Sequence, residues 1–212
     1  ASPQEAQAAG IVTIYQEFTL APDMTVAENV FIGREPGSRL FVSYRQLEEQ
    51  TAVLCRRIGL ERSPRALVRD LSVAEQQLVE IARALSMKSR VIVMDEPTSA
   101  LSQSEVAKLF AIVKSLKAEG ISIIFVTHRL EEVFAICDSY TVLRDGRLAG
   151  RGRVADTSMD GIIRLMVGRE LGLQAARQSS YVMDKAALAV RGLTRRRRIT
   201  DSSAIELHNV SF

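Results

Sequence analysis

Two short apolar runs, at residues 90–95 and 120–127, are rich in β-branched side chains and flank a segment with helical spacing. In that segment the apolar residues recur every three or four positions and define one helical face: Val106, Leu109, Phe110, Val113 and Leu116. Ser102 and Glu105 have the spacing of a capping box, and Gly120 supplies a stop signal after the helix. The alternation predicts an α/β fold in which a helix connects two buried strands of a parallel sheet.

Residues 25–88 have a mostly helical periodicity that is interrupted by Gly, Ser and Pro at 35–38 and 62–64. This pattern predicts a helical subdomain inserted before the sheet resumes. Farther along, the dipeptide Asp145-Gly146 separates two apolar stretches and predicts a hairpin of short antiparallel strands.

The composition changes again near the C-terminus. Residues 172–185 combine Gly, Gln, Ala, Ser and charged residues with little periodicity, which predicts a linker. The segments 187–191 and 204–210 have the character of two further strands.

Composition excludes few classes of protein. A content of 47% apolar and 25% charged residues is typical of an ordinary soluble core, and no apolar run reaches the roughly 18–20 residues of a membrane span. The N-terminus lacks the basic and apolar regions of a secretory signal, so we expect a cytoplasmic protein. Cys55 and Cys137 lie in apolar surroundings, which favours buried reduced thiols over a metal or redox role.

The formal net charge of +3 is concentrated in the tail. Residues 186–212 hold five Arg against Asp201 and Glu206, whereas residues 1–185 are balanced at 23 basic and 23 acidic side chains. The run of four arginines at 195–198 makes nucleic-acid binding an alternative class. No aromatic residue interleaves these arginines to stack on bases, so we favour a solvated hairpin tip and expect no specific nucleic-acid partner.

The clearest candidate chemistry follows the first apolar run, where Asp95 and Glu96 are adjacent. A phosphoryl-transfer site needs one carboxylate to hold Mg²⁺ and another group to orient the attacking water, and a rigid strand end positions both. Taken alone, such a pair more often serves to solvate a loop.

Two neighbouring features change that weighting. Ser72 and Glu75 form a second capping box before an amphipathic helix, and a helix N-terminus with free backbone N–H groups also suits a phosphate. His128 follows the second apolar run directly. By itself it would more often be a structural histidine.

Five motifs in this order and spacing resemble the ATPase domain of ABC transporters. They are the Q-loop (Gln16), the signature motif (71–77), the Walker B pair (Asp95 and Glu96), the D-loop (99–102) and the switch histidine (His128). Val73-Ala74 stand where most signatures have two glycines. With the segments 127–133 and 166–171, they resemble the first half of the tandem ATPases that serve ribose, galactose and xylose importers.

The resemblance implies a P-loop NTPase-like core with a truncated parallel sheet, a helical subdomain and short antiparallel strands. Residues 1–171 would be the first ATPase domain, 172–185 the linker, and 186–212 the opening strands of a second ATPase domain. The chain would then be a piece of a protein more than twice as long.

The resemblance also implies cofactors, ATP and Mg²⁺, and roles for individual residues. Glu96 would be the general base and His128 would contact the γ-phosphate, while Asp95 and Gln16 would bind Mg²⁺. The residues expected to contact the nucleotide and its metal are Gln16, Leu71, Ser72, Val73, Ala74, Glu75, Asp95 and Ser99. The signature residues among them would reach ATP held by the opposite ATPase half.

The implied function is to couple ATP hydrolysis to monosaccharide uptake at the inner face of a bacterial plasma membrane. Its partners would be transmembrane permease subunits, a second ATPase half and, indirectly, a periplasmic sugar-binding protein. Four apolar residues would lie where a permease helix docks, although ordinary core packing is the default for such side chains: Val26, Val30, Phe31 and Ile32.

Several features depart from the family pattern. The 212 residues contain no G-x-x-x-x-G-K-S/T motif, and the aromatic residue that stacks on adenine is absent as well. We therefore expect weak ATP binding and little activity from this chain alone, and a noncatalytic interaction fragment is the alternative. Glu75 replaces a glutamine and Ser102 replaces an aspartate common in the family.

The tail is expected to fill an open sheet edge. We predict that 187–191 and 204–210 pair with the region around 138–150, either in their own chain or in a neighbour by strand exchange, which would make a dimer.

Overall fold

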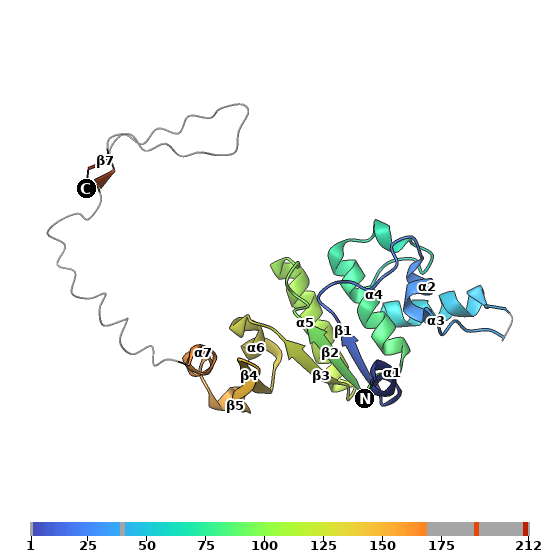
Figure 1. The fold of residues 1–212 in the computed structure, drawn as a ribbon. Coiled ribbons are helices and arrows are strands. Elements are labelled where there is room, and N and C mark those ends of the chain that lie inside the picture. Colours follow the sequence, from blue (N-terminus) through green and yellow to red (C-terminus); the bar gives the residue numbers. More distant parts are fainter. Residues whose placement is uncertain (1, 39–40, 169–188, 191–209, 212) are drawn as a thin grey trace. The chain divides into compact units, whose positions relative to one another are not determined.

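The computed structural model describes residues 2–38 and 41–168 and the short strands at 189–190 and 210–211. The chain divides into two compact units, Ala1–Ile162 and Ile163–Phe212. A three-stranded parallel sheet lies at the centre of the first unit, in the order β1 (Ile11–Ile14), β2 (Val91–Asp95) and β3 (Ser122–Val126) (Figure 1). In register, Ile14 lies opposite Met94 and Met94 opposite Phe125, so the three strands end almost in line.

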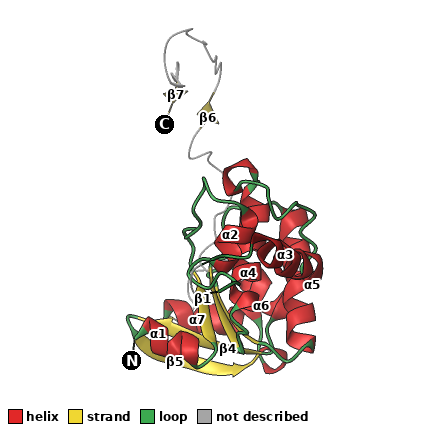
Figure 2. Cartoon of the chain, turned by 90° about the vertical axis from the view of Figure 1, so that its right-hand side faces the viewer, coloured by secondary structure: helices red, strands yellow, loops and turns green. Residues whose placement is uncertain are grey.

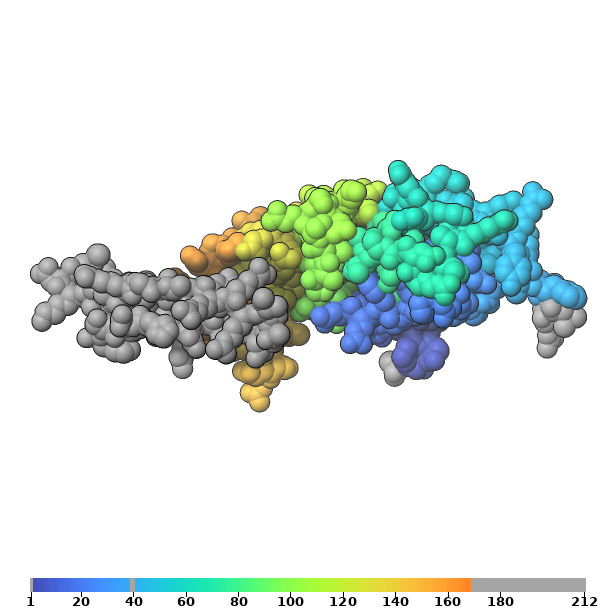
Figure 3. All heavy atoms as spheres, turned by 90° about the horizontal axis from the view of Figure 1, so that it is seen from above, coloured from blue at the N-terminus to red at the C-terminus, as the bar shows by residue number. Residues whose placement is uncertain are grey.

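The helical segment predicted at 25–88 is confirmed. It contains α2 (Val26–Phe31), α3 (Tyr44–Arg57), the 3₁₀ turn η1 (Val68–Asp70) and α4 (Val73–Ser86). Figure 2 shows these α-helices grouped on one side of the sheet strands, and in Figure 3 the same residues form one continuous mass beside the green α5.

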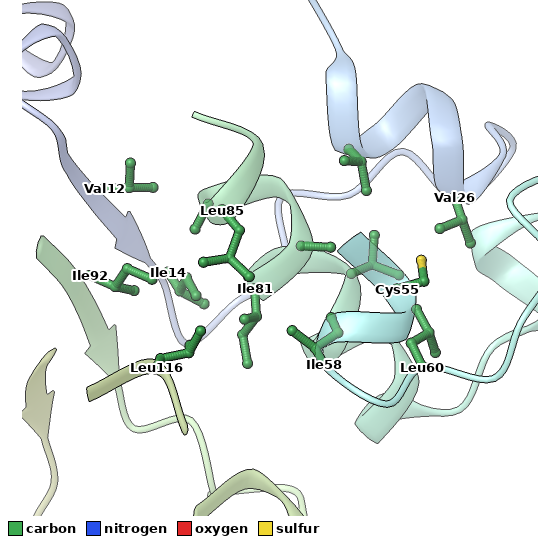
Figure 4. Packing of buried hydrophobic residues seen from close by; sticks show 14 of the residues in the cluster. Val12, Ile14, Val26, Cys55, Ile58, Leu60, Ile81, Leu85, Ile92 and Leu116 are labelled. Carbon is green, nitrogen blue, oxygen red and sulfur yellow. The ribbon is translucent and has the colours of Figure 1, made fainter. Parts of the chain in front are cut away.

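Helix α4 packs between the sheet and the other two helices of this segment. Its Ile81 and Leu85 lie close to Val12 and Ile14 of β1 and to Ile92 of β2 (Figure 4). The same cluster continues to the apolar side chains of α2 and α3, including Val26 and Cys55. One hydrophobic core therefore joins the sheet to the helical segment, and it contains the first three of the four residues considered for docking: Val26, Val30 and Phe31.

The predicted connecting helix is α5 (Gln103–Ala118), and its capping box is present because the Ser102 N–H donates to Glu105 Oε2 at 2.8 Å. On the next strand, Phe125 meets Phe110 of α5 edge to face, with ring centroids 6.1 Å apart. Helices α4 and α5 thus cover the face of the sheet that carries Ile14, Ile92 and Phe125.

The prediction that β3 is buried is wrong for its other face. Ile124 is 52% exposed and Val126 45% exposed, and Ile11 on β1 is 39% exposed. These side chains alternate with those that face the core, and the register places Ile124 beside Val93. Because β3 is the last strand of the sheet and the helices pack on one face only, the apolar run is half-buried within the described residues.

The predicted hairpin is formed by β4 (Ser139–Arg144) and β5 (Arg147–Arg153). Its two-residue turn has positive φ at both positions, 52° at Asp145 and 70° at Gly146, which is the geometry that Asp-Gly favours. The remaining elements of the described chain are α1 (Pro3–Ala8), α6 (Leu130–Ile136), the 3₁₀ turn η2 (Val154–Asp156) and α7 (Met159–Val167). We did not predict α1, although Ser2 and Glu5 form its capping box.

The described residues of the tail form a strand pair of their own. The pair β6 (Ala189–Val190) and β7 (Val210–Ser211) forms its own antiparallel sheet, while β4 and β5 pair with each other. The predicted pairing of 187–191 and 204–210 with the region around 138–150 involves mostly residues outside the described ones, so it stays a prediction both within the chain and by exchange between chains. The predicted linker at 172–185 and the arginines at 195–198 lie outside the described residues.

Both cysteines are free thiols. Cys55 is buried, as predicted, whereas Cys137 is only half-buried. No helix in the described part of the chain has the length and apolar character needed to cross a bilayer.

Candidate active site

The three parallel strands bring their carboxyl ends to the same edge of the sheet, and the predicted site residues follow these ends. Gln16 lies two residues beyond β1, Asp95 is the last residue of β2, and His128 lies two residues beyond β3. Open α/β sheets bind ligands at this edge because the loops there converge. Residues that are far apart in sequence are thus gathered by sheet topology alone.

Glu96 and His128 are in direct contact at this edge. The Nδ1 atom of His128 lies 2.9 Å from Oε1 of Glu96, although 32 positions separate the two residues in the chain. The Glu96 side chain is 30% exposed and that of His128 is 69% exposed, so both are open to a ligand. When the Glu96 carboxylate is ionised it only accepts hydrogen bonds, and the proton that bridges the pair is then on Nδ1 of His128.

The backbone of Glu96 is in a conformation unusual for a residue with a side chain. Its φ is 43°, in the left-handed region, and its N–H donates to the carbonyl oxygen of Val126 at 2.9 Å. Strained non-glycine residues of this kind concentrate at functional sites, where the surrounding structure holds them in place. The β2–β3 hydrogen bond therefore fixes the turn that directs Glu96 toward His128.

The other residues predicted for this edge are accessible. Gln16 and Ser99 are exposed, and Asp95 is half-buried. The Ser99 N–H donates to the carbonyl oxygen of Glu96 at 3.2 Å, so the predicted D-loop begins as a tight turn directly after the acidic pair.

The predicted signature residues form the start of α4. Ser72 is the N-cap: its N–H donates to Glu75 Oε2 at 2.8 Å, and the Glu75 N–H donates to Ser72 Oγ at 3.3 Å. Val73 is 43% exposed, whereas Leu71 is buried in the core and Ala74 is half-buried. Within the described chain, none of these residues is hydrogen-bonded to Glu96 or His128.

Arg62 compensates the negative charge that Glu75 adds to the signature motif. The guanidinium donates from Nε to Glu75 Oε1 at 2.7 Å and from Nη2 to Oε2 at 3.3 Å. The hydrogen bond from Arg62 is the main reason that the pKa of Glu75 lies below its ordinary value, and Ser72 contributes in the same direction while partial burial opposes both. Sequence reasoning missed Arg62, which lies 13 residues away across a loop.

Sequence reasoning also missed the most buried acid next to the site. Glu132 on α6 is only 4% exposed and accepts hydrogen bonds from the hydroxyls of Thr98 and Thr127. A signal for it exists, because Glu132 and Ile136 share one face of a helix and Ile136 faces the core.

The edge suits Mg²⁺ bound together with phosphate. Among the described residues, no cluster of three or more His, Cys, Asp or Glu side chains is arranged to hold a metal ion. Mg²⁺ commonly uses only one or two protein oxygen ligands, with water and substrate phosphates completing its octahedron. The Asp95 carboxylate and the Gln16 amide, at the same edge, match that kind of binding.

Comparison with known proteins supports the family suggested by the motifs. Residues 2–99 match the family model described as "ABC transporter". A ribose import ATP-binding protein of Streptomyces avermitilis is 50% identical over 192 residues, which are 91% of this chain and 36% of the relative. One of Geobacillus kaustophilus is 46% identical over 172 residues, 80% of this chain and 35% of the relative. The chain thus spans little more than a third of the length of these relatives.

Solved structures share the fold. The ADP conformation of an ATP-binding cassette of an ABC transporter superposes with a TM-score of 0.63 at 28% identity, covering 77% of this chain and 67% of the cassette. A nucleotide-free cassette superposes with a TM-score of 0.64 at 27% identity, and the match covers 78% of this chain and 68% of the cassette. Together with the order of motifs around the sheet edge, these comparisons show that the chain is similar in sequence and in fold to the ATP-binding proteins of ABC transporters.

Proposed function

We propose that this chain carries the hydrolytic edge of an ATP-binding subunit that couples ATP hydrolysis to monosaccharide uptake in a bacterial importer. The observation that carries the proposal is the Glu96–His128 contact of 2.9 Å at the carboxyl edge of the parallel sheet. The names of the relatives, which are ribose import ATP-binding proteins, favour a sugar as the transported solute.

In this proposal, Glu96 accepts a proton from the attacking water, since its carboxylate is accessible and is held in a fixed turn. His128 orients Glu96 through Nδ1. In its doubly protonated form it donates from both ring nitrogens, so Nε2 can hydrogen-bond to a phosphate oxygen at the same time. Asp95 and Gln16 would hold Mg²⁺, which when bound neutralises charge on the phosphates.

The start of α4 serves a second nucleotide in this proposal. Ser72, exposed Val73 and the free N–H groups of the first helical turn would face ATP held by another ATPase half. Residues 1–171 would be the first ATPase domain, 172–185 a linker and 186–212 the opening strands of the second domain. The assembled protein would act on the inner face of the plasma membrane with permease subunits, and indirectly with a periplasmic sugar-binding protein.

The test uses a chimera in which the parts of the Streptomyces avermitilis relative that precede and follow its matched region are joined to the two ends of this chain, so that a P-loop and the opposite ATPase half are both supplied. We expect Glu96→Gln to lower the rate of MgATP hydrolysis by about 10²–10⁴-fold while ATP binding persists, because an amide cannot take the proton. Glu131→Gln is the matched control, since it removes an exposed carboxylate on α6 and should leave the rate unchanged. Equal rates for all three proteins would remove Glu96 from the role of base.

Nucleotide binding by the 212 residues alone gives a second measurement. A P-loop supplies several backbone donors and a lysine, each charge-assisted bond contributing about 1.5–3 kcal/mol, and none of this motif occurs in the sequence. We therefore expect calorimetry to detect at most weak MgATP binding. Micromolar binding would show that other residues hold the phosphates.

A further inference from the structure

Glu132 is a buried carboxylate that joins two loops of the site. Its Oε1 accepts from the Thr98 hydroxyl at 2.7 Å, and its Oε2 accepts from the Thr127 hydroxyl at 2.8 Å. Arg129 Nη1 lies 3.3 Å from Oε1 and supplies a compensating positive charge from the preceding turn. Each carboxylate oxygen thus has a specific donor, which is the condition for keeping a charge in a protein interior.

Thr98 and Thr127 each lie close in sequence to one residue of the Glu96–His128 pair. Thr98 lies two residues after Glu96 and is 2% exposed, and Thr127 directly precedes His128. The Thr127 hydroxyl also accepts from the Arg129 N–H at 3.0 Å, so a hydrogen bond between its two neighbours closes the turn at His128. The Glu132 carboxylate therefore connects the backbone just after Glu96 to the backbone just before His128.

We propose that Glu132 is a positioning residue that holds the loops of Glu96 and His128 at the separation at which Nδ1 of His128 donates to Glu96. Its two oxygens act as a clamp between the turn after β2 and the turn after β3. The importance of this clamp for turnover rests on the proposed function, whereas the clamp itself is a property of the folded chain.

The need to accept two threonine hydroxyls distinguishes the positioning role of Glu132 from simple packing. Nothing apolar of the same size can accept both hydroxyls, whereas glutamine can accept one through its carbonyl oxygen and donate to the other through its amide. A purely structural residue would affect stability without changing which imidazole nitrogen carries the proton.

The test reads that proton directly. The chain contains two histidines, so His208→Gln leaves His128 as the one imidazole. Ring ¹⁵N chemical shifts of the labelled 212-residue chain in alkaline buffer then identify the neutral tautomer. With the pair intact we expect the proton on Nδ1, because the other ring nitrogen has no part in the hydrogen bond to Glu96.

In this background, Glu132→Ala should transfer the major tautomer to the Nε2–H form, and Glu132→Gln should keep Nδ1–H. Ile136→Ala, which removes a buried side chain from the same helix, is the control for general loosening of α6 and should also keep Nδ1–H. If Glu132→Ala does not fold, the shape-preserving variants Thr98→Val and Thr127→Val take its place, and we expect them together to cause the same transfer.

Three outcomes would overturn the proposal: an unchanged Nδ1–H tautomer in folded Glu132→Ala or in the double valine variant, an equal change in Ile136→Ala, or an Nε2–H tautomer in the unsubstituted chain. In the chimera, Glu132→Ala should lower kcat by about 10²-fold with little change in KM, the order expected for a misplaced catalytic group. A chimera that fails to hydrolyse ATP while the tautomer responds as expected would contradict the proposed function and leave the clamp standing.

Discussion

Glu96 offers a test in which backbone strain can be separated from side-chain chemistry. Its φ of 43° places a residue with a Cβ atom in the left-handed region, at a cost of about 1–2 kcal/mol, and glycine does not carry that cost. The hydrogen bond to His128 joins side chains that are 30% and 69% exposed, so solvent screening leaves it about 0–1 kcal/mol.

We expect Glu96→Gly to be more stable than Glu96→Ala. Both variants lose the carboxylate and its hydrogen bond, so their difference isolates the backbone. Relief of strain favours glycine by about 1–2 kcal/mol, and the greater freedom of glycine in the unfolded chain offsets about 0.5–1 kcal/mol of this. Glycine should therefore be the more stable residue by up to about 1.5 kcal/mol, measured as a shift of the urea midpoint at unchanged slope.

The matched control is Lys114, an exposed position inside α5. There glycine should be the less stable of the two by about 1 kcal/mol, because a helix interior penalises it. The prediction is thus a reversal of sign between positions 96 and 114. If alanine is the more stable residue at both, Glu96 is not held in the left-handed region and the argument about its fixed turn fails.

Three further predictions concern burial and charge. Ile92→Ala should lower the free energy of unfolding by about 2–5 kcal/mol, and Ile124→Ala on the exposed sheet face by less than about 1.5 kcal/mol, both measured by urea titration. Burial raises the pKa of Cys55 to about 11, so this thiol should resist alkylation near pH 8 until the chain unfolds. Arg62 lowers the pKa of Glu75, so the stability from this pair is present above the unfolded pKa of about 4.3 and is lost as pH falls through the lower folded pKa. Glu75→Gln should therefore make the free energy of unfolding depend less on pH in this acidic range.

The elements that could be predicted are those whose signals are local. Ser102 and Gly120 bracket α5 in the sequence, and the Asp145-Gly146 turn requires no information from elsewhere. The exposure of β3 could not be predicted in the same way. An apolar run such as 122–126 indicates a strand, but the elements that cover its two faces come from distant parts of the chain, and here α4 and α5 both pack on one face.

In the candidate site, too, some features could be predicted from the sequence and others could not. Gln16, Asp95, Glu96 and His128 were predicted from the order of motifs, and their convergence follows from the rule that parallel strands share a carboxyl edge. The contact of Arg62 with Glu75 depends on how a loop returns to the start of α4, which no local pattern specifies.

Glu131 and Glu132 show where sequence reasoning reaches its limit. The two adjacent acids are chemically identical, yet one is exposed and the other buried, and only the helical phase shared with Ile136 separates them. That phase predicts a buried acid, and a buried acid requires donors. It does not say which donors, because Thr98 lies 34 positions away and meets Glu132 only after β2 and β3 are paired. The motifs therefore identify the residues proposed to carry the chemistry, whereas the carboxylate proposed to hold them in register can be identified only from the folded contacts.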